Sequence, residues 1–136
     1  MSLDVLIVDD SAAIRKILHR VLMQAEVPLG KVHEANDGME ALEKLKAEKV
    51  GLILSDINMP NMNGFELCER IRGSATHKHL PVVALTSLAS DEHVRRGNQV
   101  GVSEYLIKLD RDKLVLALTA VLSTAGNPSS QQMASV

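Results

Sequence analysis

Four short apolar segments of this 136-residue chain each end on polar residues whose side chains can handle a metal ion or a phosphate group. The apolar segments cover residues 5–8, 52–54, 82–85 and 105–107, and they are followed by Asp9 and Asp10, by Ser55 and Asp56, by Thr86, and by Lys108. Short apolar runs separated by helical patterns are typical of buried parallel strands. Ligands of open α/β sheets bind at the carboxyl ends of the strands, so we expect these polar groups to converge on one cleft. The combination indicates a phosphoryl-transfer site.

The acidic residues of this set predict a site for a divalent cation. Two carboxylates ~4 Å apart repel by about 4 kcal/mol at an effective dielectric constant of about 20, so a cluster of Asp9, Asp10 and Asp56 requires a cation or raised pKa values. Oxygen ligands select a hard ion, and Mg²⁺ accepts a site of few carboxylates that water and substrate phosphate complete. We therefore expect Mg²⁺, with Mn²⁺ as a substitute.

The chemistry assigns a role to each remaining group. Asp56 is the expected nucleophile, Lys108 and the metal ion neutralise phosphoryl oxygens, and Thr86 donates a hydrogen bond to one of them. Taken singly, Asp9 and Asp10 read as a helix cap and a turn residue. Thr86 alone reads as a strand-end hydroxyl, and Lys108 alone as a surface lysine. Their joint occurrence at the ends of four predicted strands favours the site.

Helices are predicted between the strands. Apolar residues at helical spacing form a stripe of Ile14, Ile17, Leu18, Val21 and Leu22, with Ser11 as the expected N-cap. Further helices are predicted after the 36–38 turn, after the 60–64 loop, over 90–99 and over 114–122, and a weak strand over 31–35. This (βα)₅ pattern predicts a flavodoxin-like α/β fold, with a five-stranded parallel sheet in the order 2-1-3-4-5 and helices on both faces. We expect one domain, residues 1–123, and a disordered polar tail, residues 124–136.

Composition excludes several classes of protein. Phe65 and Tyr105 are the only aromatic residues, so no platform for stacking bases exists and direct nucleic-acid binding is not expected. The formal charge of -2 arises from 15 basic and 17 acidic residues that are mixed along the chain, which gives no membrane-attracting segment. Cys68 is the only cysteine, and no signal peptide or membrane-length apolar run is found. A cytoplasmic location is expected.

At these motifs the chain resembles the receiver domains of bacterial two-component response regulators, in particular the single-domain, CheY-like chemotaxis type. The resemblance runs from about residue 4 to residue 122. It is carried by residues 8–11, 35–38, 56–60, 63–64, 85–87, and 101 through 105 to 108. It implies that Asp56 accepts a phosphoryl group from a histidine kinase or phosphotransfer protein. It also implies that Asp10, Asp56 and the Asn58 backbone carbonyl bind Mg²⁺, that Asp9 helps through water, and that Thr86 and Tyr105 form a switch.

One position departs from the family pattern. The usual Lys-Pro step with a cis peptide is Lys108-Leu109 in this chain. A cis bond before a residue other than proline costs ~3 kcal/mol, which favours a trans peptide and a differently shaped loop.

The function expected is therefore a phosphorylation-controlled binding module, not an enzyme with turnover. The expected output surface is helix 90–99, strand 105–107 and the last helix, to which a downstream protein binds. A phosphorelay intermediate and a receiver excised from a hybrid kinase or chemotaxis protein remain alternatives. The alternative of another class is an Mg²⁺-dependent phosphatase with an aspartate nucleophile. Such phosphatases carry an Asp-x-Asp motif after their first strand, whereas this chain has adjacent Asp9 and Asp10 after its predicted first strand, residues 5–8.

Overall fold

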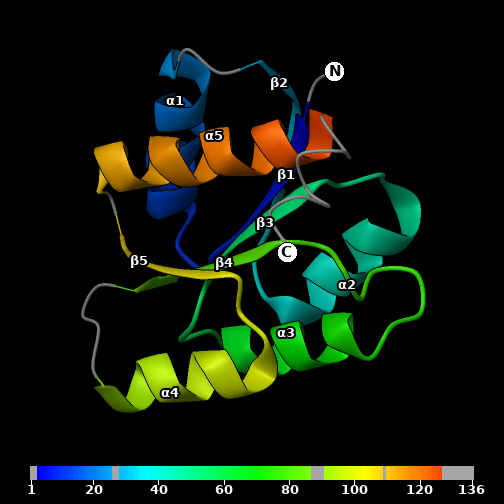
Figure 1. Ribbon diagram of the computed structural model, residues 1–136. Coiled ribbons are helices and arrows are strands. Elements are labelled where there is room, and N and C mark those ends of the chain that lie inside the picture. The colour runs from blue at the N-terminus through cyan, green and yellow to red at the C-terminus, as the bar shows by residue number, and fades with distance from the viewer. Residues whose placement is uncertain (1–2, 26–27, 87–90, 109, 127–136) are drawn as a thin grey trace, which may run out of the picture.

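The computed structural model describes residues 3–25, 28–86, 91–108 and 110–126. Within these residues, the strands β1 (Leu3–Val8), β2 (Leu29–Ala35), β3 (Leu52–Asp56), β4 (Val82–Thr86) and β5 (Glu104–Ile107) pair in parallel, in the order β2-β1-β3-β4-β5. The helices are α1 (Ala12–Gln24), α2 (Gly38–Ala47), α3 (Gly64–Arg72), α4 (Asp91–Val100) and α5 (Arg111–Gly126). Helices α1 and α5 cover one face of the sheet, and α2, α3 and α4 cover the other (Figure 1). The predicted flavodoxin-like fold and strand order are confirmed.

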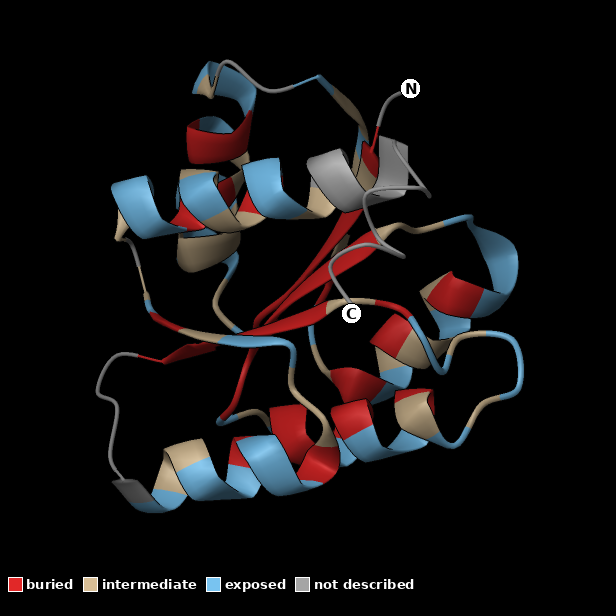
Figure 2. Cartoon of the chain, viewed as in Figure 1, coloured by how far each residue is buried: buried red, intermediate tan, exposed pale blue. Residues whose placement is uncertain are grey.

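The central strands are buried on both faces, as their continuous apolar sequences predict. Every residue of β3 and of β4 is buried, and Figure 2 shows the burial concentrated in the middle of the sheet. Successive side chains point to opposite faces. Leu6 and Ile53 therefore pack under α2 and α3, whereas Ile7 and Leu54 pack under α1 and α5. Two apolar layers result, one on each side of the sheet.

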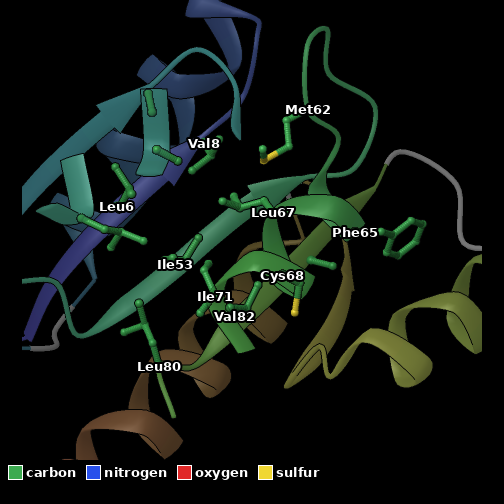
Figure 3. Close-up of a cluster of buried hydrophobic side chains, with 14 of the residues drawn as sticks. Leu6, Val8, Ile53, Met62, Phe65, Leu67, Cys68, Ile71, Leu80 and Val82 are labelled. Carbon is green, nitrogen blue, oxygen red and sulfur yellow. The ribbon is translucent and has the colours of Figure 1, made fainter. Parts of the chain in front are cut away.

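The layer under α2, α3 and α4 contains the cysteine (Figure 3). Cys68 on α3 is fully buried, and its Sγ donates to the Val100 carbonyl oxygen at 3.3 Å. Burial raises the pKa of this thiol. Cys68 therefore acts as a packing residue between α3 and the end of α4.

The helix starts follow local capping chemistry. Ser11 caps α1 by accepting from the Ile14 N–H at 3.2 Å, as predicted, and Asp37 caps α2 by accepting from the Glu40 N–H at 2.9 Å. Asn63 and Glu66 form a reciprocal capping box at the start of α3. These caps fix where the loops at the carboxyl edge of the sheet turn into helices.

Some boundaries differ from the sequence prediction. Ile17 of the predicted stripe is 42% exposed, because the stripe that α1 buries is narrower and consists of Leu18, Val21 and Leu22. Strand β2 begins at Leu29, two residues before the predicted start at 31, because it pairs along β1 from Leu3 onward. Helix α5 extends through Gly126, so residues 124–126 of the expected tail are helical, and residues 127–136 lie outside the described part.

None of the described helices is both long enough and apolar enough to span a bilayer.

Candidate functional site

Strand register brings the chemical groups to one edge of the sheet. Val8 pairs with Ser55, Asp56 with Leu85, and Thr86 with Ile107, so the carboxyl ends of β1, β3, β4 and β5 are aligned. The Lys108 N–H continues this alignment by donating to the Thr86 carbonyl oxygen. The polar residues at the ends of these strands are therefore gathered at one edge of the sheet, as the sequence predicted.

Three carboxylates meet at this edge. Asp9, Asp10 and Asp56 each offer an oxygen that lies within 4.8 Å of the others. Asp9 and Asp56 are buried, with exposures of 1% and 6%, whereas Asp10 is exposed. An exposed third carboxylate leaves one side of the cluster open to water and ligands. This oxygen-only, partly hydrated set fits a hard divalent cation such as Mg²⁺.

Lys108 bridges the two buried carboxylates. Its Nζ lies 3.0 Å from Oδ2 of Asp9 and 3.1 Å from Oδ1 of Asp56. Burial lowers the pKa of the Lys108 ammonium, but the hydrogen bonds and charges of both aspartates outweigh it, and the pKa is raised. One ammonium group balances only one of the three carboxylates, so negative charge remains for a cation to neutralise.

Backbone donors hold the same two carboxylates in place. The Ser11 N–H donates to Oδ1 of Asp9 at 2.8 Å, and the Ile57 N–H donates to Oδ1 of Asp56 at 2.8 Å. Burial and the charge of Asp9 raise the pKa of the Asp56 carboxyl, against the opposing effect of Lys108. Ile57 and Lys108 both contact Oδ1 of Asp56, so Oδ2 is the oxygen that neither of them engages.

A close backbone approach at Gly64 positions the segment after β3. A Cβ at Gly64 would lie 2.3 Å from the Asp56 carbonyl oxygen, a distance that no side chain tolerates. The Gly64 N–H also donates to the Ile57 carbonyl oxygen at 2.9 Å. Glycine at this position lets α3 begin directly beneath Asp56. The sequence places Gly64 in a loop but carries no signal for this contact.

Thr86 and Tyr105 lie next to each other between this edge and α4. Thr86 is buried at the end of β4, and Tyr105 is paired in register with Ala84 on β5. Burial raises the pKa of the Tyr105 phenol, while its neighbour Thr86 acts in the opposite direction. The Tyr105 hydroxyl oxygen is buried, and the ring lies beside Gly97 of α4. The Tyr105 ring therefore lies between Thr86 and Gly97 of α4.

Two predicted features of the site concern Asn58 and Leu109, which follow β3 and β5. Asn58, whose carbonyl was expected to bind the metal, is exposed directly after Ile57. Leu109 lies outside the described residues, and with it the geometry of the Lys108-Leu109 peptide.

Two residues that sequence reasoning did not single out, Arg15 and Glu34, lie beside the acidic edge. The Arg15 side chain donates to the Asp9 carbonyl oxygen at 2.6 Å and to Glu34 at 3.0 Å.

Comparison with known proteins places this geometry in one family. Residues 5–119 match the response regulator receiver domain. Chemotaxis protein CheY-3 of Vibrio cholerae is 36% identical over 107 residues, which are 79% of this chain and 81% of that protein. The gliding motility regulatory protein of Myxococcus xanthus is 41% identical over 116 residues, which are 85% of this chain but 14% of that protein.

Solved structures agree with the sequence matches. The structure of CheY4 from Vibrio cholerae superimposes with a TM-score of 0.80 at 36% identity, covering 90% of this chain and all of the other. A putative response regulator from Chloroflexus aurantiacus gives a TM-score of 0.82 at 28% identity, covering 90% of this chain and 99% of the other. The chain therefore belongs to the response regulator receiver domain family and is a CheY-like member of it.

Proposed function

We propose that this receiver is a signalling switch in which Asp56 accepts a phosphoryl group from a histidine kinase or a phosphotransfer protein. The observation that carries the proposal is the bridge from Lys108 to Asp9 and Asp56 at 3.0 and 3.1 Å, beside the exposed Asp10. A buried carboxylate can act as a nucleophile, and the ammonium group beside it can stabilise the charge on a transferred phosphoryl group. Family membership supports the same role.

The residues would divide the chemistry as follows. Oδ2 of Asp56 attacks the phosphorus, the bond from phosphorus to the donor's histidine nitrogen breaks, and that nitrogen keeps the electron pair. Asp10, Asp56 and the Asn58 carbonyl would hold Mg²⁺, with Asp9 acting through water, and the bound ion would supply positive charge next to the phosphoryl oxygens. Lys108, whose Nζ lies 3.1 Å from Oδ1 of Asp56, would neutralise a further phosphoryl oxygen. Thr86 donates its hydroxyl hydrogen to the third.

We further propose that the output surface consists of α4, β5 and α5. A groove of about 520 Å³ lies on this face, lined among others by Val94, Tyr105, Lys113, Leu116 and Ala117. Leu116 is 69% exposed and Ile107 is 39% exposed, so apolar side chains are available for a downstream protein. Tyr105 belongs both to this groove and to the contact with Thr86, which supports its role in the switch.

Three related roles fit the same chemistry. The Vibrio cholerae relative is of similar length to this chain, whereas the Myxococcus xanthus relative is a much larger protein that contains a similar segment. A diffusible messenger, a phosphorelay intermediate and a receiver within a larger chain therefore remain compatible with the site. The comparisons give no support to the phosphatase alternative.

Incubation with Mg²⁺ and acetyl phosphate tests the assignment. We expect one phosphoryl group per chain, labile to base and to hydroxylamine, as an acyl phosphate is. Asp56→Asn should lose it, whereas Asp112→Asn, which changes an exposed aspartate at the start of α5, should be labelled like the wild type. Full labelling of the Asp56 variant would refute the role of Asp56, and steady turnover of a phosphomonoester would favour the phosphatase.

A further inference from the structure

Of the three clustered aspartates, Asp9, Asp10 and Asp56, only Asp10 is exposed. Asp9 and Asp56 are buried and are contacted by both a backbone N–H and Lys108, whereas Asp10 is exposed. An exposed carboxylate side chain would lose conformational entropy when it binds a metal ion. Tight binding therefore needs some other contact that restricts where Asp10 can lie.

Arg15 supplies such a contact. Its Nη1 donates to the Asp9 carbonyl oxygen at 2.6 Å, and this carbonyl belongs to the peptide that joins Asp9 to Asp10. Because a peptide unit is planar, fixing its carbonyl also fixes the N–H and the Cα of Asp10. The Asp10 carboxylate can then move only through the dihedral angles of its own residue.

Glu34 in turn orients Arg15. Oε1 of Glu34 lies 3.0 Å from Nε of Arg15, and the Arg15 side chain is only 13% exposed. Glu34 is paired in register with Ile7 on β1, so it projects to the face of the sheet that α1 covers. The planar guanidinium group therefore spans from β2 to the β1–α1 turn, with one donor on each partner. A lysine has no second donor in such a fixed geometry.

We propose that Arg15, oriented by Glu34, is a positioning residue for the metal site: by holding the Asp9 carbonyl, it fixes the Asp10 carboxylate in the place where Mg²⁺ binds. The inference rests on the proposed Mg²⁺-dependent function. Outer contacts that orient metal ligands typically change metal affinity by about 10- to 100-fold.

If Arg15 affected the site only through its charge, replacing it would change Mg²⁺ affinity in the direction opposite to that expected for a positioning residue. Arg15 is a cation beside a cation site, so removing its charge should strengthen Mg²⁺ binding if charge is all that matters. Removing a positioning contact should weaken binding. The direction of the change therefore separates the two explanations.

Calorimetric titration of the full chain with Mg²⁺, repeated with Mn²⁺ by electron paramagnetic resonance, tests the proposal. Arg15→Gln should weaken binding about tenfold. The matched control is Lys16→Gln, which removes the same charge from the next, exposed position of α1 and should leave affinity unchanged or slightly stronger. Arg15→Lys should recover part of the loss. Backbone amide spectra should show the altered Mg²⁺ response at Asp10 and Ser11.

Glu34→Gln gives a second test that keeps the arginine in place. We expect a smaller weakening, and no further weakening when Glu34→Gln is combined with Arg15→Gln, because Glu34 acts through Arg15. If Arg15→Gln fails to fold, the single Glu34 variant decides alone. Unchanged or stronger binding in either variant would overturn the inference while leaving the proposed function intact. A wild type that binds no Mg²⁺ would overturn both.

Discussion

The acidic edge of the sheet and the α4–β5–α5 face are held by different kinds of contact. At the edge, Asp9 and Asp56 are buried and bridged by Lys108. On the α4–β5–α5 face, β5 buries only Leu106, and α4 is joined to α3 by an ion pair between Arg96 and Glu69 whose side chains are each 49% exposed. Regions with few buried contacts open at lower free energy than the core. A fixed chemical site thus adjoins a face that a modest free energy can rearrange.

Removing the bridging ammonium should have the largest effect on stability. Lys108→Met leaves Asp9 and Asp56 buried together without their cation, which we expect to lower the free energy of unfolding by about 3 kcal/mol in the absence of metal. Mg²⁺ should restore part of the loss. Urea denaturation with and without Mg²⁺ measures both values, and a loss below about 0.5 kcal/mol would mean that the edge is held no more firmly than the surface.

Crowding the backbone beneath Asp56 should have the next largest effect. Gly64→Ala places a methyl group against the Asp56 carbonyl oxygen, and we expect a loss of about 2 kcal/mol together with slower phosphorylation. The control is Gly73→Ala at the end of α3, where the nearest atom would be 3.5 Å away and φ is -81°. Equal thermal stability of the two variants would contradict the close approach at Gly64.

The metal ion should stabilise the edge selectively. At a concentration ten times its dissociation constant, Mg²⁺ should add about 1.4 kcal/mol to the free energy of unfolding, because it binds the folded chain. Asp10→Ala should abolish this gain. Differential scanning calorimetry checks it, and a melting temperature that is indifferent to Mg²⁺ in the wild type would argue against the metal site.

Acidic pH should relieve the repulsion at the edge. The folded chain raises the pKa of Asp56 above its ordinary value of 3.8, chiefly through burial and the charge of Asp9. The folded state therefore binds a proton at the Asp56 carboxyl more readily than the unfolded state does. The contribution of this carboxyl to the free energy of unfolding falls as the pH rises from its ordinary pKa of 3.8 through its raised pKa in the folded chain. Asp56→Asn should be more stable than the wild type at about pH 7, and the difference should shrink toward about pH 3.5. A difference that stays constant across this range would contradict the raised pKa.

Breaking the ion pair between α3 and α4 should have the smallest effect. Arg96→Gln removes an exposed interaction, so we expect a change of at most about 0.5 kcal/mol in global stability. Hydrogen exchange should nevertheless accelerate in α4 more than in α3, because α3 buries five residues whereas, among the described side chains of α4, only Gly97 and Val100 are buried. An equal change in exchange rate in α3 and α4 would contradict the difference in stability between the acidic edge and the α4–β5–α5 face.

Sequence patterns predicted the elements that depend on local chemistry. Continuous apolar runs identified β1, β3 and β4, because a strand buried on both faces needs apolar residues at every position. Ser11 was identified as a cap because its residue type is preferred at helix N-termini. The convergence of Asp9, Asp10, Asp56 and Lys108 followed from strand order alone. Such features are set by neighbours in the chain or by the topology of the sheet.

Contacts between distant and ordinary residues could not be predicted. Arg15 and Glu34 are common surface residue types 19 positions apart, and only the packing of α1 on β2 brings them together beside Asp9. The exposure of Ile17 and the early start of β2 likewise depend on how wide the covered face of the sheet is. The close approach at Gly64 depends on where α3 lies relative to β3.

Beryllofluoride titration monitored by backbone amide NMR tests most directly whether the edge controls the face. Beryllofluoride in the presence of Mg²⁺ stands in for the phosphoryl group on Asp56. A ligand shifts a two-state equilibrium only by its differential affinity for the two states. We predict large changes at residues 91–108 and 110–118, changes at Asp10 and Ser11 next to the site, small changes within α1 and α2, and a blunted distant response in Thr86→Ala. Changes confined to the acidic edge, or concentrated in α1, would contradict the account.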